Sequence, residues 1–369
     1  MDGDVILVIV VATALAFDFT NGFHDTANVV ATSISTRAMG PRIAVGYAAV
    51  LNFAGAFLSL AVAATIAKGI VEADVITPLI IFGGLIGAIS WNLITWYFGL
   101  PSSSSHALIG GVVGSAFVAA GPDAILGDGI LSKVVIPGLV APILALVVAS
   151  LAIVIVYKVV GRLRPGPVSR GFKAGQVVSA GMLALAHGTN DAQKTMGIIT
   201  LALVANGTLS SENFEVPMWV IVSSASAIAL GTYAGGWRII KTMGSRIIKM
   251  DTAQGFSAQG AGAAVILASS QVGYPLSTTQ TITGAVMGAG AGKRISAVRW
   301  GVAGNIVLAW ALTLPGSAVI GAATYGLTRV FGTGAAGPLV VSVVALVVVG
   351  AAFVRRLQQG PSITAPAEA

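Results

Sequence analysis

Long apolar runs recur along this chain of 369 residues, and they constrain its fold more than any other feature. Residues 5–17, 134–157, 300–314 and 338–354 are almost entirely apolar. A helix needs about 20 apolar residues to cross the roughly 30 Å hydrocarbon core of a bilayer. Only 9% of the residues are charged, against roughly 25% in soluble domains, so the chain lacks the charges to cover a water-facing surface. The sequence therefore predicts an all-α polytopic membrane protein.

Other features of the composition narrow the functional classes. There is no cysteine, which excludes disulfides, thiolate metal sites and a cysteine nucleophile, and three histidines are too few for a histidine-rich metal centre. The formal net charge of +7 is divided among separate loops, so we expect no nucleic-acid partner. Asp2 and Asp4 stand where a signal peptide would have basic residues, so we expect the first apolar run to be retained as a helix.

The charges between the apolar runs predict the topology. Lysines and arginines gather in five loops and acidic residues in the others, and loops rich in Lys and Arg face the cytoplasm. The alternation places the N-terminus outside and the C-terminus in the cytoplasm, in a plasma membrane of bacterial or archaeal type. The basic loops hold Arg37 and Arg42; Lys158, Arg162, Arg164, Arg170 and Lys173; Arg238, Lys241, Arg246 and Lys249; Lys293, Arg294 and Arg299; and Arg355 with Arg356. The acidic loops hold Asp2, Asp4, Glu72, Asp74, Asp123, Asp128, Glu212 and Glu215.

Two motifs occur twice in the chain. Residues 21–27 align with residues 187–193 at an offset of 166, and residues 101–110 align with residues 275–284 at an offset of 174. The predicted path crosses the membrane in opposite directions in the two halves. Inverted repeats with interrupted helices are typical of secondary transporters, whose binding site lies between the repeats near the membrane midplane. We therefore predict about 11 to 12 helical segments in two inverted-topology repeats.

The predicted organisation has four parts, and each repeat contains one re-entrant or broken-helix hairpin, at residues 75–120 and 252–292. The parts are the first inverted repeat at residues 1–158, a cytoplasmic basic linker at 159–174, the second inverted repeat at 175–323, and an extra C-terminal helix with a polar tail at 324–369.

Asp25 and Asp191 are carboxylates in the middle of apolar segments. Within a membrane, a carboxylate costs a few kcal/mol or more unless it is paired, protonated or bound to a cation. Side-chain amide oxygens, together with backbone carbonyls freed where a helix breaks, suit a hard cation such as sodium. The alternative is a pair of structural aspartates that cap helix breaks. The flanking amides are Asn21 and Asn28 in the first copy, and Asn190 and Gln193 in the second.

Both copies of the second motif begin with a proline followed by hydroxyl side chains. Proline favours the first helical turn and Ser or Thr caps backbone amides, so we expect two helix N-termini that attract an anion. The alternative is that the hydroxyls only hydrogen-bond neighbouring helices. A serine beside His106 suggests an intramembrane hydrolase as another alternative. The second copy of the motif has Gln280 in place of the histidine, so we expect no enzyme and no catalytic residue. The hydroxyls are Ser103, Ser104, Ser105, Ser277, Thr278 and Thr279.

The charges of the two motifs predict coupled transport. Neither motif contains an arginine that could neutralise an oxyanion such as phosphate or sulfate, and burying such an anion alone is prohibitive. Cations held by Asp25 and Asp191 beside the anion would neutralise it, which predicts symport. Lys194 follows Asp191 by three residues and is either a local ion-pair partner or a substrate contact. Asn52 and Gln259 are lesser candidates, each a polar residue in or near the end of an apolar helix.

At these residues the chain resembles the inorganic phosphate transporter family. The resemblance rests on residues 22–28, 188–194, 91–101 and 275–279, and it extends over about residues 5–323. It implies phosphate uptake coupled to a cation, which is sodium in many members and a proton in some bacterial ones. It also implies that Asp25, Asn28, Asn190 and Asp191 bind the coupling ion and that the hydroxyl clusters hold phosphate.

The sequence thus predicts a secondary active transporter that imports inorganic phosphate with sodium by alternating access. We expect Asn21, Gln193, Asn52 and Gln259 to support the sodium-binding residues, and no cofactor besides the coupling ion. The alternatives are proton coupling, sulfate transport on the same scaffold and, from another class, an anion channel. Expected partners are phosphate, sodium and the lipid bilayer, and a homodimer is left open.

Overall fold

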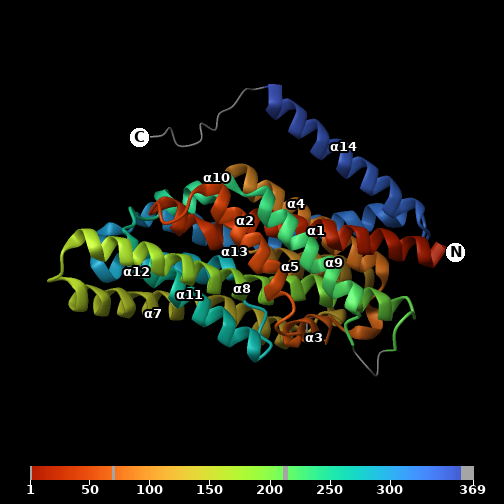
Figure 1. Ribbon diagram of the computed structural model, residues 1–369. Helices are drawn as coiled ribbons and strands as arrows, with labels where there is room; N and C mark the ends of the chain where they lie inside the picture. Colours follow the sequence, from red (N-terminus) through yellow and green to blue (C-terminus); the bar gives the residue numbers. More distant parts are fainter. Residues whose placement is uncertain (1, 69–70, 211–214, 359–369) are drawn as a thin grey trace.

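In the computed structural model, the described residues 2–68, 71–210 and 215–358 form helices joined by short connections (Figure 1). Among them the only β pairing is an isolated bridge between Val71 and Ile125. Eleven of the fourteen α-helices in this part of the chain are longer than eight residues, in agreement with the predicted 11 to 12 segments. The all-α prediction is therefore confirmed for the described residues.

The helices of the two halves follow one another in the same order. The first half contains α1 (Asp2–Ser35), α2 (Pro41–Gly55), α3 (Ala61–Lys68), α4 (Pro78–Phe98), α5 (Ser104–Ala120), α6 (Gly127–Ile130) and α7 (Ile136–Val160). The second half contains α8 (Pro165–Ala205), α9 (Met218–Ala234), α10 (Trp237–Lys241), α11 (Thr252–Gln271), α12 (Thr278–Lys293) and α13 (Trp300–Val330), and α14 (Ala336–Gln358) follows.

Four helical segments are long and apolar enough to cross a membrane: α1, α4, α13 and the segment Gly127–Val160 that includes α7. A fifth span arises if α9 and the following residues Trp237–Arg246, which are bent by 60° relative to each other, are taken together. The motif-bearing helices α8 and α12 are less apolar because they carry polar side chains, and the motif-bearing stretches of both are buried by neighbouring helices. Neighbouring helices therefore cover the stretches that carry the polar motifs, whereas most of α13 and of the segment Gly127–Val160 stays uncovered.

The two halves pack against each other through equivalent glycines. Gly22 in α1 faces a backbone carbonyl of α9, and Gly188 in α8 faces one of α2; an added Cβ would lie 2.2 and 2.1 Å from the carbonyl oxygen. Gly110 in α5 and Gly284 in α12 make the same approach to α13 and α7, at 2.4 and 2.2 Å. These glycines are separated by the offsets of the two motifs, so the predicted repeat is also a repeat in packing. Figure 1 shows α7 beside α12, a pair that crosses between the halves.

The predicted helix breaks at the aspartates are wrong. α1 and α8 run without interruption through Asp25 and Asp191. The glycines nearby allow close helix packing, and no proline removes a backbone donor there. The breaks lie in the two hairpins, at residues 99–103 between α4 and α5 and at 272–277 between α11 and α12.

The connection between the halves is shorter than the predicted linker. α7 ends at Val160 and α8 begins at Pro165, so residues 165–174 form the first turns of α8. Proline is favoured in a first helical turn, where its missing N–H has no partner to lose. The boundaries of the two repeats remain predictions.

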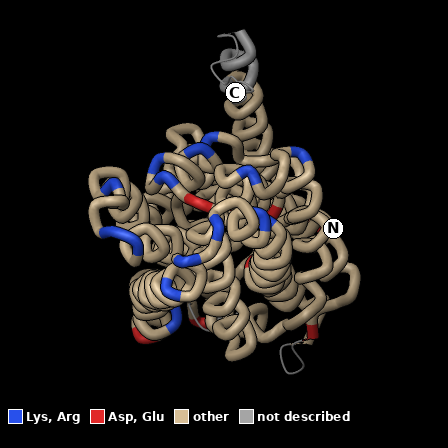
Figure 2. Tube along the Cα trace, turned by 60° about the vertical axis from the view of Figure 1, so that its left-hand side comes forward, with Lys and Arg blue, Asp and Glu red and all other residues tan. Residues whose placement is uncertain are grey.

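Most lysines and arginines lie at one end of the molecule, the end turned toward the viewer in Figure 2. The connection from α7 to α8 and the end of α12 are at this end, on the left in Figure 1. This grouping agrees with basic loops on one side of the membrane, while the orientation of the chain remains a prediction. Of the acidic positions assigned to the other side, Glu212 lies outside the described residues.

Candidate functional site

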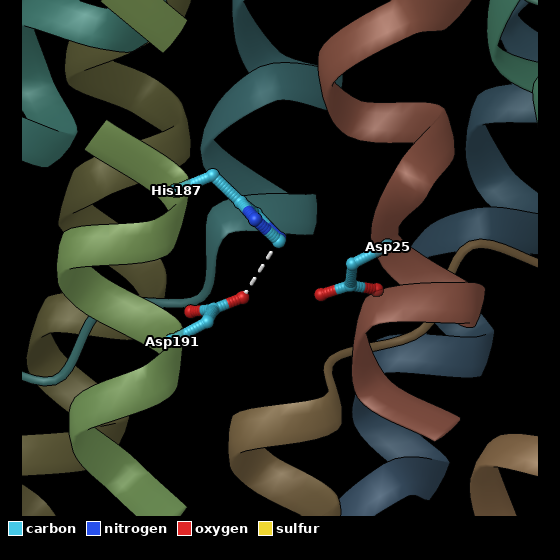
Figure 3. A group of neighbouring side chains, drawn as sticks. All are labelled: Asp25, His187 and Asp191. Carbon is cyan, nitrogen blue, oxygen red and sulfur yellow. Dashed lines mark ion pairs between the residues drawn. The ribbon is translucent and has the colours of Figure 1, made fainter. Parts of the chain in front are cut away.

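The two aspartate motifs meet in the interior of the protein. Asp25 of α1 and His187 and Asp191 of α8 each offer an oxygen or nitrogen atom, and these atoms all lie within 4.8 Å of one another (Figure 3). All three side chains are buried. Residues from the two halves of the sequence thus form one centre, in which two carboxylates face each other.

Hydroxyls from both hairpins surround the carboxylate of Asp25. Its Oδ2 accepts a hydrogen bond from Ser104 Oγ at 3.0 Å, and its Oδ1 accepts one from Thr279 Oγ1 at 3.2 Å. Thr278 Oγ1 lies 3.4 Å from Oδ2, and His24 Nδ1 lies 2.6 Å from Oδ1. The Asp25 carboxyl group is therefore buried and contacted by hydroxyls at the N-terminal ends of α5 and α12.

Asp191 has a different set of partners. Lys194 Nζ, one turn further along α8, pairs with its Oδ1. Its Oδ2 accepts a hydrogen bond from Thr278 Oγ1 at 3.0 Å and lies 3.0 Å from His187 Nε2. The Thr278 hydroxyl has one proton and two carboxylates within reach, so it links the two halves of the centre.

The ends of α5 and α12 are built alike. Ser103 caps α5 by accepting the His106 amide at 3.1 Å, and Ser277 caps α12 by accepting the Gln280 amide at 3.3 Å. The following hydroxyls point to other groups: those of Ser104, Thr278 and Thr279 lie against the carboxylates, and that of Ser105 accepts from Lys194. The structure thus brings the six predicted hydroxyls to one place. Two of them cap the helices, and the other four contact the aspartates or Lys194. Amides and hydroxyls at a helix N-terminus favour negative charge, which here is the charge of the aspartates.

Two predicted amide ligands, Asn28 and Asn190, each keep an unpartnered oxygen, and Asn28 contacts the centre through Thr279. Asn28 Nδ2 donates to Thr279 Oγ1 at 2.9 Å, and Asn190 Nδ2 donates to Ser270 Oγ at 2.9 Å. Both side chains are buried, and neither Oδ1 has a hydrogen-bond partner in the described part of the chain. Oxygens of this kind are suitable ligands for a hard cation.

Of the four predicted supporting residues, Asn52 and Asn21 lie beside other buried polar residues of the site, whereas Gln193 and Gln259 bond to other helices. Asn52 Oδ1 lies 3.2 Å from His187 Nδ1 and orients that imidazole, while Asn21 is buried beside the carboxyl group of Asp18. Gln193 instead accepts the Val62 amide at 2.7 Å, at the start of α3.

Gln259 is also used for packing between helices. Its Oε1 accepts from Ser179 at 2.9 Å, and its Nε2 donates to Ser33 at 2.7 Å. These contacts join α11 to α8 and α1, so the structure does not bring Gln259 or Gln193 to the carboxylates through a hydrogen bond.

Sequence reasoning did not assign His187 to the site, although its spacing carries a signal. His187 precedes Asp191 by four residues, and residues four apart lie on the same helix face. Thr95 was missed as well: its hydroxyl lies 3.2 Å from His24 Nε2 and 2.7 Å from the Ser102 hydroxyl. Its contact with His24 spans 71 residues, and no local pattern predicts it.

Asp18 is a further buried acid on α1. It is fully buried, and Thr195 and Asn21 are its nearest polar side chains. Asp191 and Lys194 lie close enough to act on it electrostatically. The centre therefore contains three buried carboxyl groups and one lysine.

Comparisons with known proteins identify the family of the chain. Residues 21–166 and 162–321 match the model of the phosphate transporter family. A probable low-affinity inorganic phosphate transporter of Mycobacterium tuberculosis is 54% identical over 327 residues, covering 89% of this chain and 78% of the relative. One from Rhizobium meliloti is 50% identical over 321 residues, covering 87% of this chain and 96% of the relative. The chain is also similar to a solved structure described as the sodium-dependent phosphate transporter, with a TM-score of 0.77, 25% identity, and coverage of 88% of this chain and 99% of that one.

This chain belongs to the phosphate transporter family. Its relatives are transporters rather than enzymes, which confirms the expected class and the multi-pass membrane fold.

Proposed function

We propose that the chain imports inorganic phosphate by symport with a cation, with sodium as the favoured ion, through alternating access. The observation that carries the proposal is the buried centre in which Asp25 and Asp191 meet the N-terminal ends of α5 and α12. A site that combines carboxylates with anion-attracting helix ends has the chemistry for a cation and an anion together.

Phosphate would bind at the hydroxyls of Ser103, Ser104 and Ser105 and of Ser277, Thr278 and Thr279. Ser104 and Thr278 donate to carboxylate oxygens, so they already face negative charge, as they would with a phosphate oxygen. A tetrahedral oxyanion has enough acceptor oxygens to use donors from both helix ends. Because hydroxyls add no charge, the neutralising charge has to come from elsewhere.

The cation would bind at Asp25 and Asp191 with the amide oxygens of Asn28 and Asn190. Both amide oxygens are buried and unpartnered among the described residues. A buried carboxylate centre and a phosphate repel each other, so neither can hold its charge in low dielectric without cations. The solved relative described as sodium-dependent supports sodium as the ion.

Proton coupling is the second candidate, and one contact favours it. His24 Nδ1 lies 2.6 Å from Asp25 Oδ1, so a proton could be held between an imidazole and a carboxylate. An imidazole can accept and release a proton, so His24 has the chemistry of a proton carrier.

Alternating access draws support from the packing of the repeats. Each half contributes one hairpin and one long terminal helix that packs on the hairpin of the other half, so one half can rock against the other around the site. We further propose a plasma-membrane location with the N-terminus outside and the C-terminus in the cytoplasm. A homodimer stays a prediction.

The test is uptake of labelled phosphate into proteoliposomes under an imposed sodium gradient or an imposed proton gradient, with excess sulfate as a competitor. We expect phosphate uptake that requires the sodium gradient and is not reduced by excess sulfate. Uptake driven only by protons would favour the second candidate, and loss of the signal to sulfate would indicate a sulfate permease. Conductance without any cation requirement would contradict symport and indicate a channel.

A variant of the hydroxyl cluster tests the phosphate site. Thr278→Val removes the hydroxyl that links the two carboxylates and should raise the KM for phosphate about tenfold or more, as expected for a lost hydrogen bond to a charged group. Ser115→Ala is the matched control, because this buried hydroxyl donates to the Gly321 carbonyl away from the aspartates. Equal KM values for both variants and the wild type would contradict the assignment.

A further inference from the structure

Lys194 and Asn28 occupy equivalent positions in the two halves. They are separated by the same 166 residues as Asp191 and Asp25. Asn28 Nδ2 donates to Thr279 Oγ1 at 2.9 Å, and Lys194 Nζ donates to Ser105 Oγ at 2.5 Å. The two acceptors are equivalent in the hairpin motif, at its offset of 174. The same cross-half contact is therefore made by a neutral amide in one half and by an ammonium in the other.

The ammonium of Lys194 has the surroundings of a bound cation. The side chain is 1% exposed, and its Nζ contacts one oxygen each from the Asp191 carboxylate, the Ser105 hydroxyl and the Leu276 carbonyl. An ammonium has three donors, and here each has an oxygen acceptor. Carboxylate, hydroxyl and carbonyl oxygens are also the ligands of hard cations in proteins.

A simple ion pair along α8 does not explain these contacts. An (i, i+3) pair requires only Asp191, whereas Ser105 lies at the N-terminal end of α5 and Leu276 lies in the segment before α12. The contacts with Ser105 and Leu276 span 89 and 82 residues. The ammonium thus touches both hairpins at the point where the helix ends meet.

The other half has no corresponding ammonium. Among the residues that the structure describes, Asp25 has His24 and three hydroxyls as partners and no lysine or arginine. The Asn28 amide oxygen is buried without a hydrogen-bond partner in the same part of the chain. Beside Asp25 the chain therefore offers oxygen ligands but no ammonium. At the equivalent place beside Asp191, Lys194 supplies the positive charge.

We propose that the Lys194 ammonium is a tethered cation that takes the second of two pseudo-symmetric cation positions, the one at Asp191. This narrows the cation site proposed above to the Asp25 half, which alone binds an exchangeable ion. The transporter then moves one cation fewer per phosphate than a centre with two exchangeable positions. This inference rests on the proposed symport, because it assigns the cation count of the same site.

The substitution Lys194→Asn gives the second half the side chain of the first. We expect the number of sodium ions per phosphate to rise by about one, whether the wild type uses sodium or protons. The measurement is the sodium gradient that stops net flux of labelled phosphate in proteoliposomes held at zero membrane potential and equal pH. A roughly tenfold phosphate gradient is balanced by a roughly tenfold sodium gradient for one sodium and by about a threefold gradient for two.

The reciprocal exchange Asn28→Lys with Lys194→Asn is the matched control. It keeps the composition of the site and moves the tethered charge to the other half, so the sodium count should return to the wild-type value. Asp191→Asn should then remove sodium dependence in the exchanged background. An unchanged count in Lys194→Asn would overturn the inference, and so would a count in the exchange that stays about one higher than in the wild type.

Binding of labelled sodium to detergent-purified protein serves as the second readout if Lys194→Asn folds but does not transport. We expect about one more sodium bound per chain than in the wild type, and equal binding would overturn the inference. If the wild type itself moves no phosphate under any cation gradient, the proposed function fails first, which distinguishes that failure from a failure of the cation count.

Discussion

The aspartate motifs of α1 and α8 share a backbone arrangement but differ in charge. Each motif lies in a continuous helix, and three residues before each aspartate a glycine packs on a backbone carbonyl of the other half. Each carboxylate also accepts a hydrogen bond from a hydroxyl in the hairpin of its own half. Asp25 has His24 as its basic neighbour, whereas Asp191 has Lys194 and His187. The repeat thus preserves the geometry while letting the two halves take different electrostatic roles.

Removal of the Asp191 charge should have the largest effect, and on stability. Asp191→Asn leaves the buried Lys194 ammonium without its counter-charge, at a cost of about 3–5 kcal/mol. Thermal unfolding in detergent should show a much lower Tm for this variant than for Asp25→Asn. The double variant Asp191→Asn with Lys194→Met removes both charges and should recover most of the loss. Equal Tm values for the two single variants would mean that the halves do not differ in this way.

Asp25→Asn should act on transport instead of stability. No lysine depends on this carboxylate among the described residues, but the proposed exchangeable cation does. We expect coupled uptake to fall about 100-fold, which corresponds to roughly 2.7 kcal/mol, with little change in Tm. Sodium-dependent phosphate uptake in proteoliposomes checks this, and normal uptake would contradict the cation site at Asp25.

The glycine contacts predict a matched pair of smaller effects. A Cβ at Gly22 or Gly188 would lie 2.2 or 2.1 Å from a carbonyl oxygen, so both helices would have to move apart. Gly22→Ala and Gly188→Ala should each destabilise the protein by about 1–3 kcal/mol, the usual cost of overpacking. Gly46→Ala is the control, because nothing lies within 4 Å of its added Cβ. If only one of the first two variants lowered the Tm, the packing of the halves would not be equivalent.

The smallest effect concerns the caps that begin the hairpins. Thr77 caps α4 and accepts the Ile80 amide at 3.4 Å, and Asp251 caps α11 and accepts the Gln254 amide at 2.9 Å. Burial raises the pKa of Asp251, but hydrogen bonds from the Tyr157 hydroxyl, the Gln254 amide and Lys293 outweigh it, so the pKa lies below its usual value.

A lowered folded-state pKa means that Asp251 contributes stability above its unfolded pKa of about 3.9, and that this contribution is lost as the pH falls through the folded pKa. The carboxylate is partly exposed, so the contribution should stay below about 1 kcal/mol. Asp251→Asn should lower the Tm slightly at neutral pH and have no effect at the acidic end of the range. Thr77→Val tests the other hairpin, where no such pH dependence is expected.

The sequence predicted the helical membrane fold well and the residues of the candidate site only in part. Apolar runs and the repeated motifs identified the fold class and the two hairpins, and they named both aspartates that meet at the centre but not His187. They placed helix breaks at the aspartates, where α1 and α8 are continuous, and they left the role of Lys194 open between two readings. Gln193 and Gln259 looked equivalent to the other amides, yet their hydrogen bonds serve the start of α3 and the packing of α11.

By itself, the sequence determined the class of fold, the repeat and the chemical character of each motif, because hydrophobic length, loop charge and side-chain type are local properties of the chain. Only the tertiary structure decided which hydroxyl meets which carboxylate and that Lys194 reaches Ser105, 89 residues away in sequence. The basic neighbours that distinguish the two aspartates, His24 beside Asp25 and His187 with Lys194 beside Asp191, can be read along the chain because they lie within four residues. The hydroxyl partners cannot, because they depend on how the helices of one half pack against the hairpin of the other.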